Sequence, residues 1–204
     1  MSRYQVVQLL HDHGISSCLW SEDALGFYGV PTVLFELYLL VADSDLDKAV
    51  SVLSESPGYR HVPPDEEEMA TNRPRQYFLQ YWASRYTNPG SDDDKIGLQL
   101  LPAMEFAEFD ISPDTTVKQG ILLYPKLAEF IEALVYQYLR PAETRVARAY
   151  ATHVRMYITY LAASAPERDS VLQLLTPKAC RLWGDMLKEE MILGEEGIKY
   201  YRKI

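Results

Sequence analysis

The spacing of apolar residues along the first forty positions alternates between helical and strand-like. Residues 3–13 carry apolar side chains at helical intervals and end at Gly14, a residue that favours the position after a helix. Residues 15–20 form a short apolar run typical of a strand. Residues 33–41 are β-branched, aromatic and apolar on both faces, which predicts the central strand of a sheet.

Further elements are predicted from the same spacing and from turn-forming residues. A helix is expected from Ser21 to about Gly29, and another begins at Asp43 or Ser44. Later strands are expected over residues 77–82 and 96–101, and a less regular one over 105–111, with proline-rich or turn-rich segments at 56–75 and 88–94.

From Pro125 onward the apolar residues repeat only at helical spacing, over about 127–138, 142–163 and 178–193. A mixed half followed by a helical half predicts an α/β (α+β) fold, in which a mixed sheet has flanking helices and a C-terminal helical part follows. We expect an α/β core over residues 1–120 and a helical part over 121–204 packed on that core.

Charge and cysteine content narrow the functional classes. The 204 residues carry a net charge of −9, which disfavours nonspecific nucleic-acid binding. Cys18 and Cys180 both lie in apolar stretches, and no CxxC or HxxxH spacing occurs, so we expect no disulfide framework, no Cys/His metal site and no cofactor. The N-terminus lacks signal-peptide features, and no run approaches ~20 apolar residues. We therefore expect a cytoplasmic protein that does not cross a membrane.

The segment 19–32 has the pattern LW-x-E-x-AL followed by YGVPT, and it precedes the run at 33–41 and a helix. This order of strand, short helix, central strand and helix resembles the nucleotidyltransferase-like superfamily, in particular the branch with antitoxin-type and aminoglycoside-type transferases. The opening is also similar to that of uncharacterised fungal proteins. The resemblance covers roughly residues 5–110. It implies a small-residue turn after the first strand and three carboxylates on later strands that hold two metal ions.

On this resemblance the turn falls at Trp20-Ser21-Glu22, the paired carboxylate positions at Glu36 and Tyr38, and the third at Gln99. Two divalent cations need several oxygen ligands, and only Glu36 is acidic. We therefore expect no metal site and no ordinary nucleotidyl transfer. Glu36, Ser21 and Tyr38 are the candidate catalytic residues.

Glu22 and Asp23 are candidate substrate-binding residues beside Glu36, and Gln99 is a third. A charge within an apolar strand is costly unless it is paired or used, which favours a role for Glu36. The alternative stays open that Ser21 only caps a helix, that the two acids only pair with its dipole, and that Glu36 lies at a sheet surface.

An arginine stripe on the helix over 142–163 is the second candidate site. Arg145, Arg148 and Arg155 fall on one face with no acidic residue between them, which suits a wall that binds phosphate or carboxylate. A stripe that reaches solvent or pairs with acidic loops is the alternative. His153, between Tyr150 and Tyr157, is more typical of a core residue than of a base.

Two functions remain open. The first is a non-canonical group-transfer enzyme on a nucleotidyltransferase-like scaffold. Its most concrete form resembles fungal arginine-using cyclodipeptide synthases of secondary metabolism, which depend on aminoacyl-tRNA, and the arginine stripe would contact that anionic partner. The second is a catalytically inactive nucleotidyltransferase-fold binding or regulatory protein.

Overall fold

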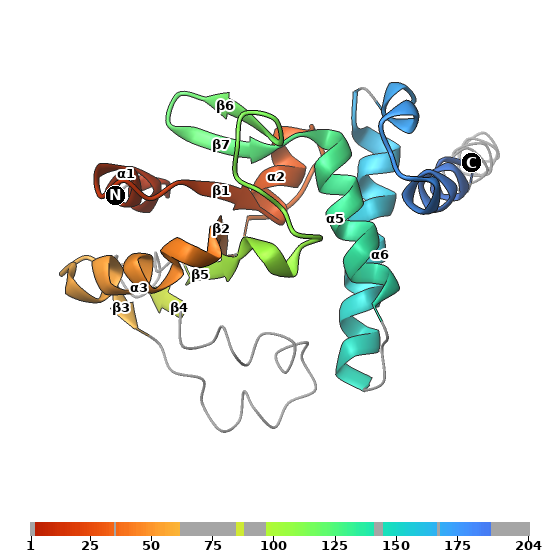
Figure 1. Cartoon of the computed structure of the whole chain (residues 1–204). Helices are drawn as coiled ribbons and strands as arrows, with labels where there is room; N and C mark the ends of the chain where they lie inside the picture. Colours follow the sequence, from red (N-terminus) through yellow and green to blue (C-terminus); the bar gives the residue numbers. More distant parts are fainter. Residues whose placement is uncertain are drawn as a thin grey trace, which may run out of the picture.

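The computed structural model describes residues 3–34, 36–61, 85–87, 97–140, 145–166 and 168–188, and the side chains of all these except 61, 85–87 and 145–150. A mixed sheet forms its centre (Figure 1), with strand order β3-β4-β5-β2-β1-β7-β6. Strand β2 pairs antiparallel with β1 and parallel with β5, and β1 pairs parallel with β7. The strands are β1 (Ser17–Trp20), β2 (Leu37–Val41), β3 (Arg60–His61), β4 (Arg85–Thr87), β5 (Gly97–Pro102), β6 (Thr116–Gln119) and β7 (Leu122–Pro125).

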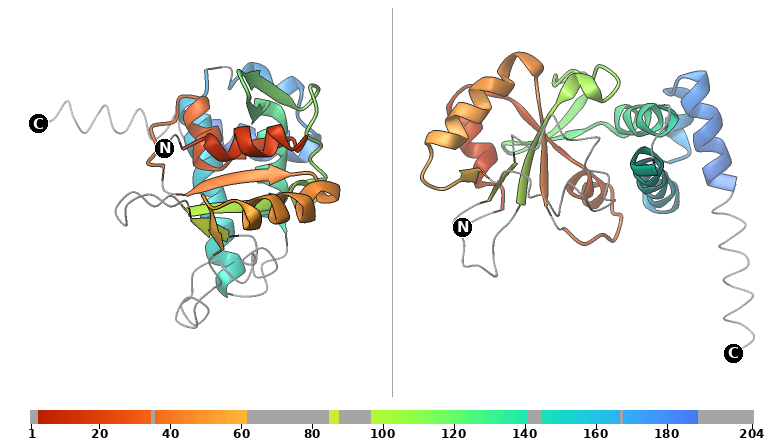
Figure 2. Two further views of the ribbon diagram at one scale, coloured as in Figure 1. Left: turned by 90° about the vertical axis from the view of Figure 1, so that its left-hand side faces the viewer. Right: turned by 90° about the horizontal axis from the view of Figure 1, so that it is seen from below.

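Helices cover both faces of this sheet (Figure 2), which confirms the expected α/β (α+β) class. The helices are α1 (Gln5–Asp12), α2 (Glu22–Phe27), α3 (Leu46–Glu55), α5 (Leu127–Leu139) and α6 (Arg145–Ser164), with 3-10 turns at Asp43–Asp45, Ala103–Glu105 and Ser170–Gln173 and a further helix over 177–188. None of the helices in the described ranges is long and apolar enough to span a membrane.

The two faces of the sheet bury separate apolar clusters. On one face, α1 and α3 pack with Leu37, Leu39 and Val41 of β2. On the other, Leu40 and Trp20 join α2, α5, α6 and the segment C-terminal to them. Alternate residues of β2 point to opposite faces, so both sides of the strand are buried, as its apolar composition predicts.

An aromatic group fixes the helical part against the sheet. Trp20, the last residue of β1, meets Phe106, Phe109 and Phe130 edge-on, with ring centroids 5.1, 5.5 and 4.9 Å away. Edge-to-face pairs of this kind stabilise beyond the area they bury. Because Phe130 belongs to α5, the first strand and the C-terminal helices share one core.

Several sequence predictions need correction or fall outside the described residues. The central strand begins at Leu37 rather than Val33. Strand β1 ends at Trp20, which pairs with Tyr38, so β1 has no residue left to pair with the positions before Leu37. Residues 105–111 are not a strand, since Ala107 and Glu108 adopt positive φ. The hairpin of β6 and β7 was not predicted. The expected strand at 77–82 lies outside the described residues.

The burial of Cys18 predicts unequal reactivity of the two thiols. Cys18 is fully buried in β1, and burial raises the pKa of its thiol, whereas Cys180 is only half-buried. In the folded protein at neutral pH, dithionitrobenzoate should label Cys180 and leave Cys18 unmodified until denaturant is added. A Cys180→Ser variant that still reacts rapidly in the native state would contradict this packing of β1.

Candidate functional site

Glu36, Tyr38 and Gln99 lie together at the start of β2. Tyr38 and Gln99 are direct neighbours in the parallel pairing of β2 with β5. Gln99 Nε2 donates a hydrogen bond of 2.5 Å to Glu36 Oε2, and Tyr38 Oη donates one of 3.3 Å to the same oxygen. The three positions that the resemblance assigned to metal ligands therefore lie together. The side chains at two of them donate hydrogen bonds to the carboxylate at the third.

Glu36 itself lies immediately before β2 and is half-buried, not inside the strand as the sequence suggested. The position is still tightly enclosed. A Cβ atom at Gly97, the first residue of β5, would lie 2.8 Å from Glu36 Oε1 and 3.0 Å from its Cδ. Glycine is thus needed at this position so that the Glu36 side chain can lie across β5.

Arg3 connects Glu36 to the helix α2. Its Nη2 donates to Asp23 Oδ2 at 2.8 Å and to the backbone oxygen of Glu36 at 2.6 Å, while its Nε donates to Asp23 Oδ1 at 3.2 Å. Tyr4 Oη also donates to Asp23 Oδ1, at 2.8 Å. The Asp23 side chain is buried, and its bidentate pairing with Arg3 compensates its charge. This ion pair joins the N-terminal segment before α1 to α2 and to the start of β2.

Ser21 occupies an unusual position between β1 and α2. Its backbone has φ 57° and ψ −126°, in the left-handed region that serine rarely adopts. Its hydroxyl does not cap α2, which corrects the capping alternative. Instead, Ser21 Oγ donates to Tyr157 Oη at 3.0 Å across to α6.

Tyr157 is the centre of a buried polar chain that the sequence did not reveal. Its hydroxyl donates to Glu22 Oε1, and His153 Nε2 lies 2.7 Å from the same hydroxyl oxygen. A phenol has one proton to donate, so with Tyr157 donating to Glu22 the His153 Nε2 acts as donor. His153 is exposed, and the chain leads from it through Tyr157 to buried Ser21 and Glu22.

The environment of these tyrosines favours their neutral form. Burial raises the pKa of Tyr157, and the charge of Glu22 and the hydrogen bond to it raise it further. Burial likewise raises the pKa of Tyr4, and its hydrogen bond to Asp23 acts in the same direction. Both phenols therefore keep their protons and act as donors to the carboxylates of α2.

One carboxylate oxygen beside Tyr157 accepts no hydrogen bond from the described part of the protein. Glu22 is 8% exposed, and its Oε2 is fully buried with no donor among the described residues. Buried polar atoms are ordinarily satisfied by protein groups or ordered water, so this oxygen can accept a further hydrogen bond. Glu22 thus faces the interior beside Ser21 rather than solvent, and it does more than complement the helix dipole.

Arg155 is the one arginine of the predicted stripe whose side chain is described, and it does not join this cluster. Arg155 is exposed and precedes Tyr157 by two residues on α6. Successive residues of an α-helix are rotated by about 100° about its axis, so Arg155 and Tyr157 are about 200° apart and lie on nearly opposite faces of α6. The side chains of Arg145 and Arg148 lie outside the described residues.

The donor set does not suit a pair of divalent cations. Such ions need several carboxylate oxygens directed to one point. Here Glu36 Oε2 accepts two protein hydrogen bonds, and Gln99 directs its amide nitrogen towards it. Among the residues that the structure describes, no group of three or more His, Cys, Asp or Glu side chains could hold a metal ion.

A solved structure resembles this chain, whereas comparisons of the sequence give no match. No protein-family model matches the sequence, and no curated protein matches it either. The chain is similar to the crystal structure of JHP933 from Helicobacter pylori, with 13% sequence identity, a TM-score of 0.39, and coverage of 97% of this chain and 92% of that one.

A Gly97→Ala substitution should disturb the Glu36 cluster. The added methyl group would overlap Glu36, so we expect a loss of about 1–3 kcal/mol in the free energy of unfolding measured with urea. Gly58→Ala is the matched control, because nothing lies within 4 Å of its Cβ position, and it should change stability by less than about 0.5 kcal/mol. Equal stabilities for the two variants would show that Glu36 does not occupy this position.

Proposed function

We propose that the chain is a binding or regulatory module on a nucleotidyltransferase-like scaffold that does not perform metal-dependent nucleotidyl transfer. One observation carries the proposal. The Glu36 carboxylate, at the position where this resemblance requires a metal ligand, accepts hydrogen bonds from the side chains at the other two ligand positions, Gln99 and Tyr38.

This hydrogen bonding favours a structural use of the former ligand positions. An amide and a phenol each supply a donor that stabilises one carboxylate without any cation. The nearby Asp23 is likewise paired by Arg3. Binding in such a module would use surfaces outside these satisfied carboxylates, and it would need no Mg²⁺.

Restoring acids at the two substituted positions tests the assignment. Wild-type protein should neither bind Mn²⁺, measured by calorimetry, nor transfer label from radioactive ATP with Mg²⁺. Tyr38→Asp combined with Gln99→Asp should gain saturable Mn²⁺ binding, because three carboxylates would then meet beside the β2–β5 pair. Gln119→Asp combined with Tyr136→Asp, which adds the same two charges at exposed positions elsewhere, is the control and should bind no Mn²⁺.

Two results would contradict the proposal. Nucleotidyl transfer by the wild-type protein would show an active metal site. A folded double-aspartate variant without Mn²⁺ binding would show that Tyr38 and Gln99 do not correspond to ligand positions.

A second candidate function, metal-independent group transfer, is favoured by the chain from Ser21 through Tyr157 to Glu22. Ser21 donates to Tyr157, which donates to a buried carboxylate, and the Ser21 backbone is in a rarely populated conformation. A hydroxyl linked to a carboxylate in this way has a route by which to lose its proton when it attacks an acyl group.

The aminoacyl-tRNA-dependent form of this reaction can be written with these residues as follows. Ser21 Oγ would bond to the carbonyl carbon of the aminoacyl ester while its proton moves through Tyr157 to Glu22. The ester bond to the ribose oxygen would break, and that oxygen would leave as a hydroxyl after the proton returns along the same path. The amino group of a second aminoacyl-tRNA would then attack the acyl-serine, and the Ser21 oxygen would leave and regain its proton, which gives a dipeptidyl-tRNA. The free amino group of that dipeptide would finally attack its own ester carbonyl, closing the ring and releasing the second tRNA with its ribose hydroxyl restored. Cyclodipeptide formation is the most concrete version of this candidate.

Metabolite analysis of expressing cells tests the second candidate. If it holds, extracts of cells with the wild-type protein should contain a cyclic dipeptide that cells with Ser21→Ala or Tyr157→Phe lack, with losses of at least about 100-fold because the nucleophile or its proton route is removed. Ser164→Ala, at the exposed end of α6, should keep full production. Production by the Ser21→Ala variant, or none by the wild type, would remove this candidate.

A further inference from the structure

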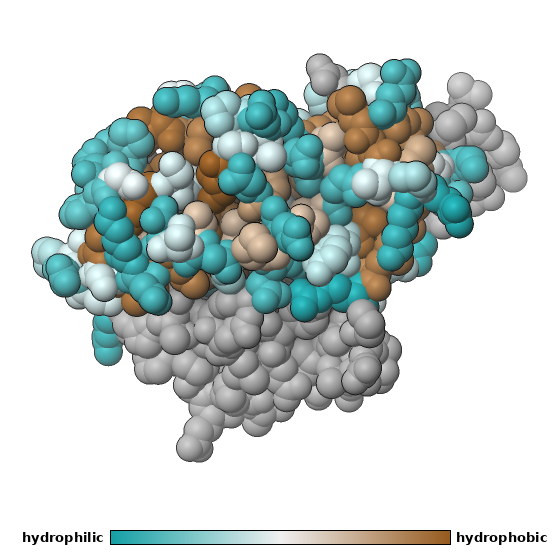
Figure 3. All heavy atoms as spheres, viewed as in Figure 1, coloured by the Kyte–Doolittle hydropathy of each residue, from teal (hydrophilic) through white to brown (hydrophobic). Residues whose placement is uncertain are grey.

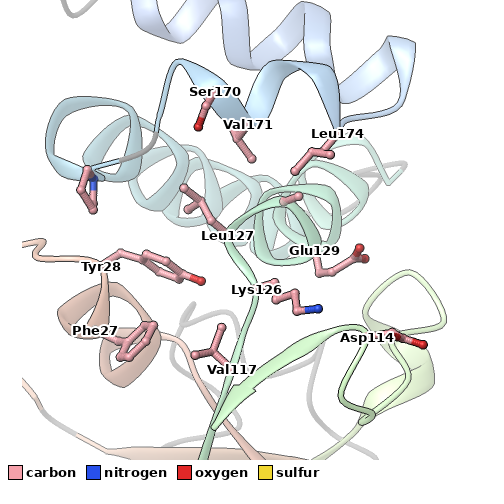
Figure 4. Close-up of a pocket in the computed structure, with 12 residues that line it drawn as sticks. Phe27, Tyr28, Asp114, Val117, Lys126, Leu127, Glu129, Ser170, Val171 and Leu174 are labelled. Carbon is pink, nitrogen blue, oxygen red and sulfur yellow. The ribbon is translucent and has the colours of Figure 1, made fainter. Parts of the chain in front are cut away.

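A pocket of about 730 Å³ lies between four segments of the chain (Figure 4). The end of α2, strand β6, the start of α5 and residues 166 and 170–174 form its walls. Its volume falls within the range of about 300–1,000 Å³ that is usual for small-molecule sites. It shares no lining residue with the Ser21–Glu36 cluster, so it is a separate site whose proposed ligand does not rest on the function proposed for that cluster.

The walls of this pocket are mainly apolar. Phe27 and Tyr28 contribute aromatic rings from α2, and Leu127 and Val171 contribute aliphatic side chains from the opposite side. Phe27 stacks on Tyr124 at 4.2 Å between ring centroids, and Tyr28 Oη donates to the Pro125 oxygen at 2.7 Å. These contacts hold both rings in place, so the aromatic wall is preformed.

Two of the apolar side chains that line this pocket are exposed to solvent. Leu174 is 73% exposed, and Val117 across from it is 37% exposed. Apolar residues also reach the molecular surface over the segment C-terminal to α6 (Figure 3). Large exposed apolar side chains beside a concave apolar surface are typical of binding sites.

Three charged side chains line the same pocket without mutual pairing. Lys126 extends from the start of α5 into the space between Glu129 and Asp114 (Figure 4). In the described part of the chain none of these three side chains has a hydrogen bond or an ion pair. The pocket therefore offers one ammonium group and two carboxylates close to an apolar wall.

We propose that this pocket binds a small zwitterion with a large apolar side chain, an apolar amino acid or dipeptide. A ligand with only a carboxylate would pair with Lys126 but would be repelled by Glu129 and Asp114. A ligand with only an amine would pair with the acids and be repelled by Lys126. A molecule with both charges satisfies all three groups, and its side chain covers Phe27 and Leu174.

The test uses the dipeptide phenylalanyl-leucine and two blocked forms of it, titrated into the full chain by calorimetry. The free dipeptide should bind saturably, and either N-acetylation or C-terminal amidation should weaken binding at least about fivefold by removing one charge pair. Lys126→Met and Leu174→Ser should each weaken binding of the free dipeptide about fivefold or more. Their matched controls are Lys118→Met on β6 and Leu139→Ser on α5, both exposed and outside the pocket, and these should bind like wild type.

Three outcomes would overturn the proposal. They are the absence of saturable binding by the free dipeptide, equal binding by either blocked form, and unchanged binding by the Lys126→Met and Leu174→Ser variants. Because the four substituted positions are all at least partly exposed, circular dichroism should show that each variant stays folded.

Discussion

The parallel pairing of β2 with β5 is the constraint on which the polar cluster depends. It places Gln99 directly beside Tyr38, and Gln99 then reaches the carboxylate of Glu36. A shift of this register by one residue would turn Gln99 to the opposite face and bring Leu98 or Leu100 into its place. The buried apolar faces of both strands prevent such a shift, so the packing of two apolar clusters also fixes the position of the polar side chains.

Helix α2 connects the Ser21–Glu36 cluster with the pocket beside α5. It is six residues long, yet it presents Glu22 to Tyr157, Asp23 to Arg3, and Phe27 to the pocket beside α5. A helix this short has little stability of its own. Its position therefore comes from its partners in α1, α6 and β7, and a ligand in the pocket would contact the same helix whose first turn holds the buried carboxylates.

Three carboxylates in this region are stabilised in different ways. Asp23 has an arginine and a phenol, and the half-buried Glu36 has an amide and a phenol. Glu22 has a phenol on one oxygen and, among the described residues, no donor on the other. The first arrangement is complete and structural. The hydrogen-bonded link from Ser21 through Tyr157 to Glu22, together with the positive φ of Ser21, is the physical basis of the group-transfer candidate.

Apolar patterns along the chain were enough to predict the class of fold, whereas a family resemblance selected the polar positions. Apolar periodicity is a local property, and it located α1, β1, α3, β5 and the helices after Pro125 to within a few residues. The resemblance to the nucleotidyltransferase-like superfamily, rather than periodicity, selected Ser21, Glu36, Tyr38 and Gln99. How these positions are used depends on tertiary contacts. Arg3 pairs with Asp23 across 20 residues, and Tyr157 meets Ser21 across 136. Contacts over such separations leave no periodic signal in a single sequence, because they depend on how the helices pack on the sheet rather than on the residues nearby.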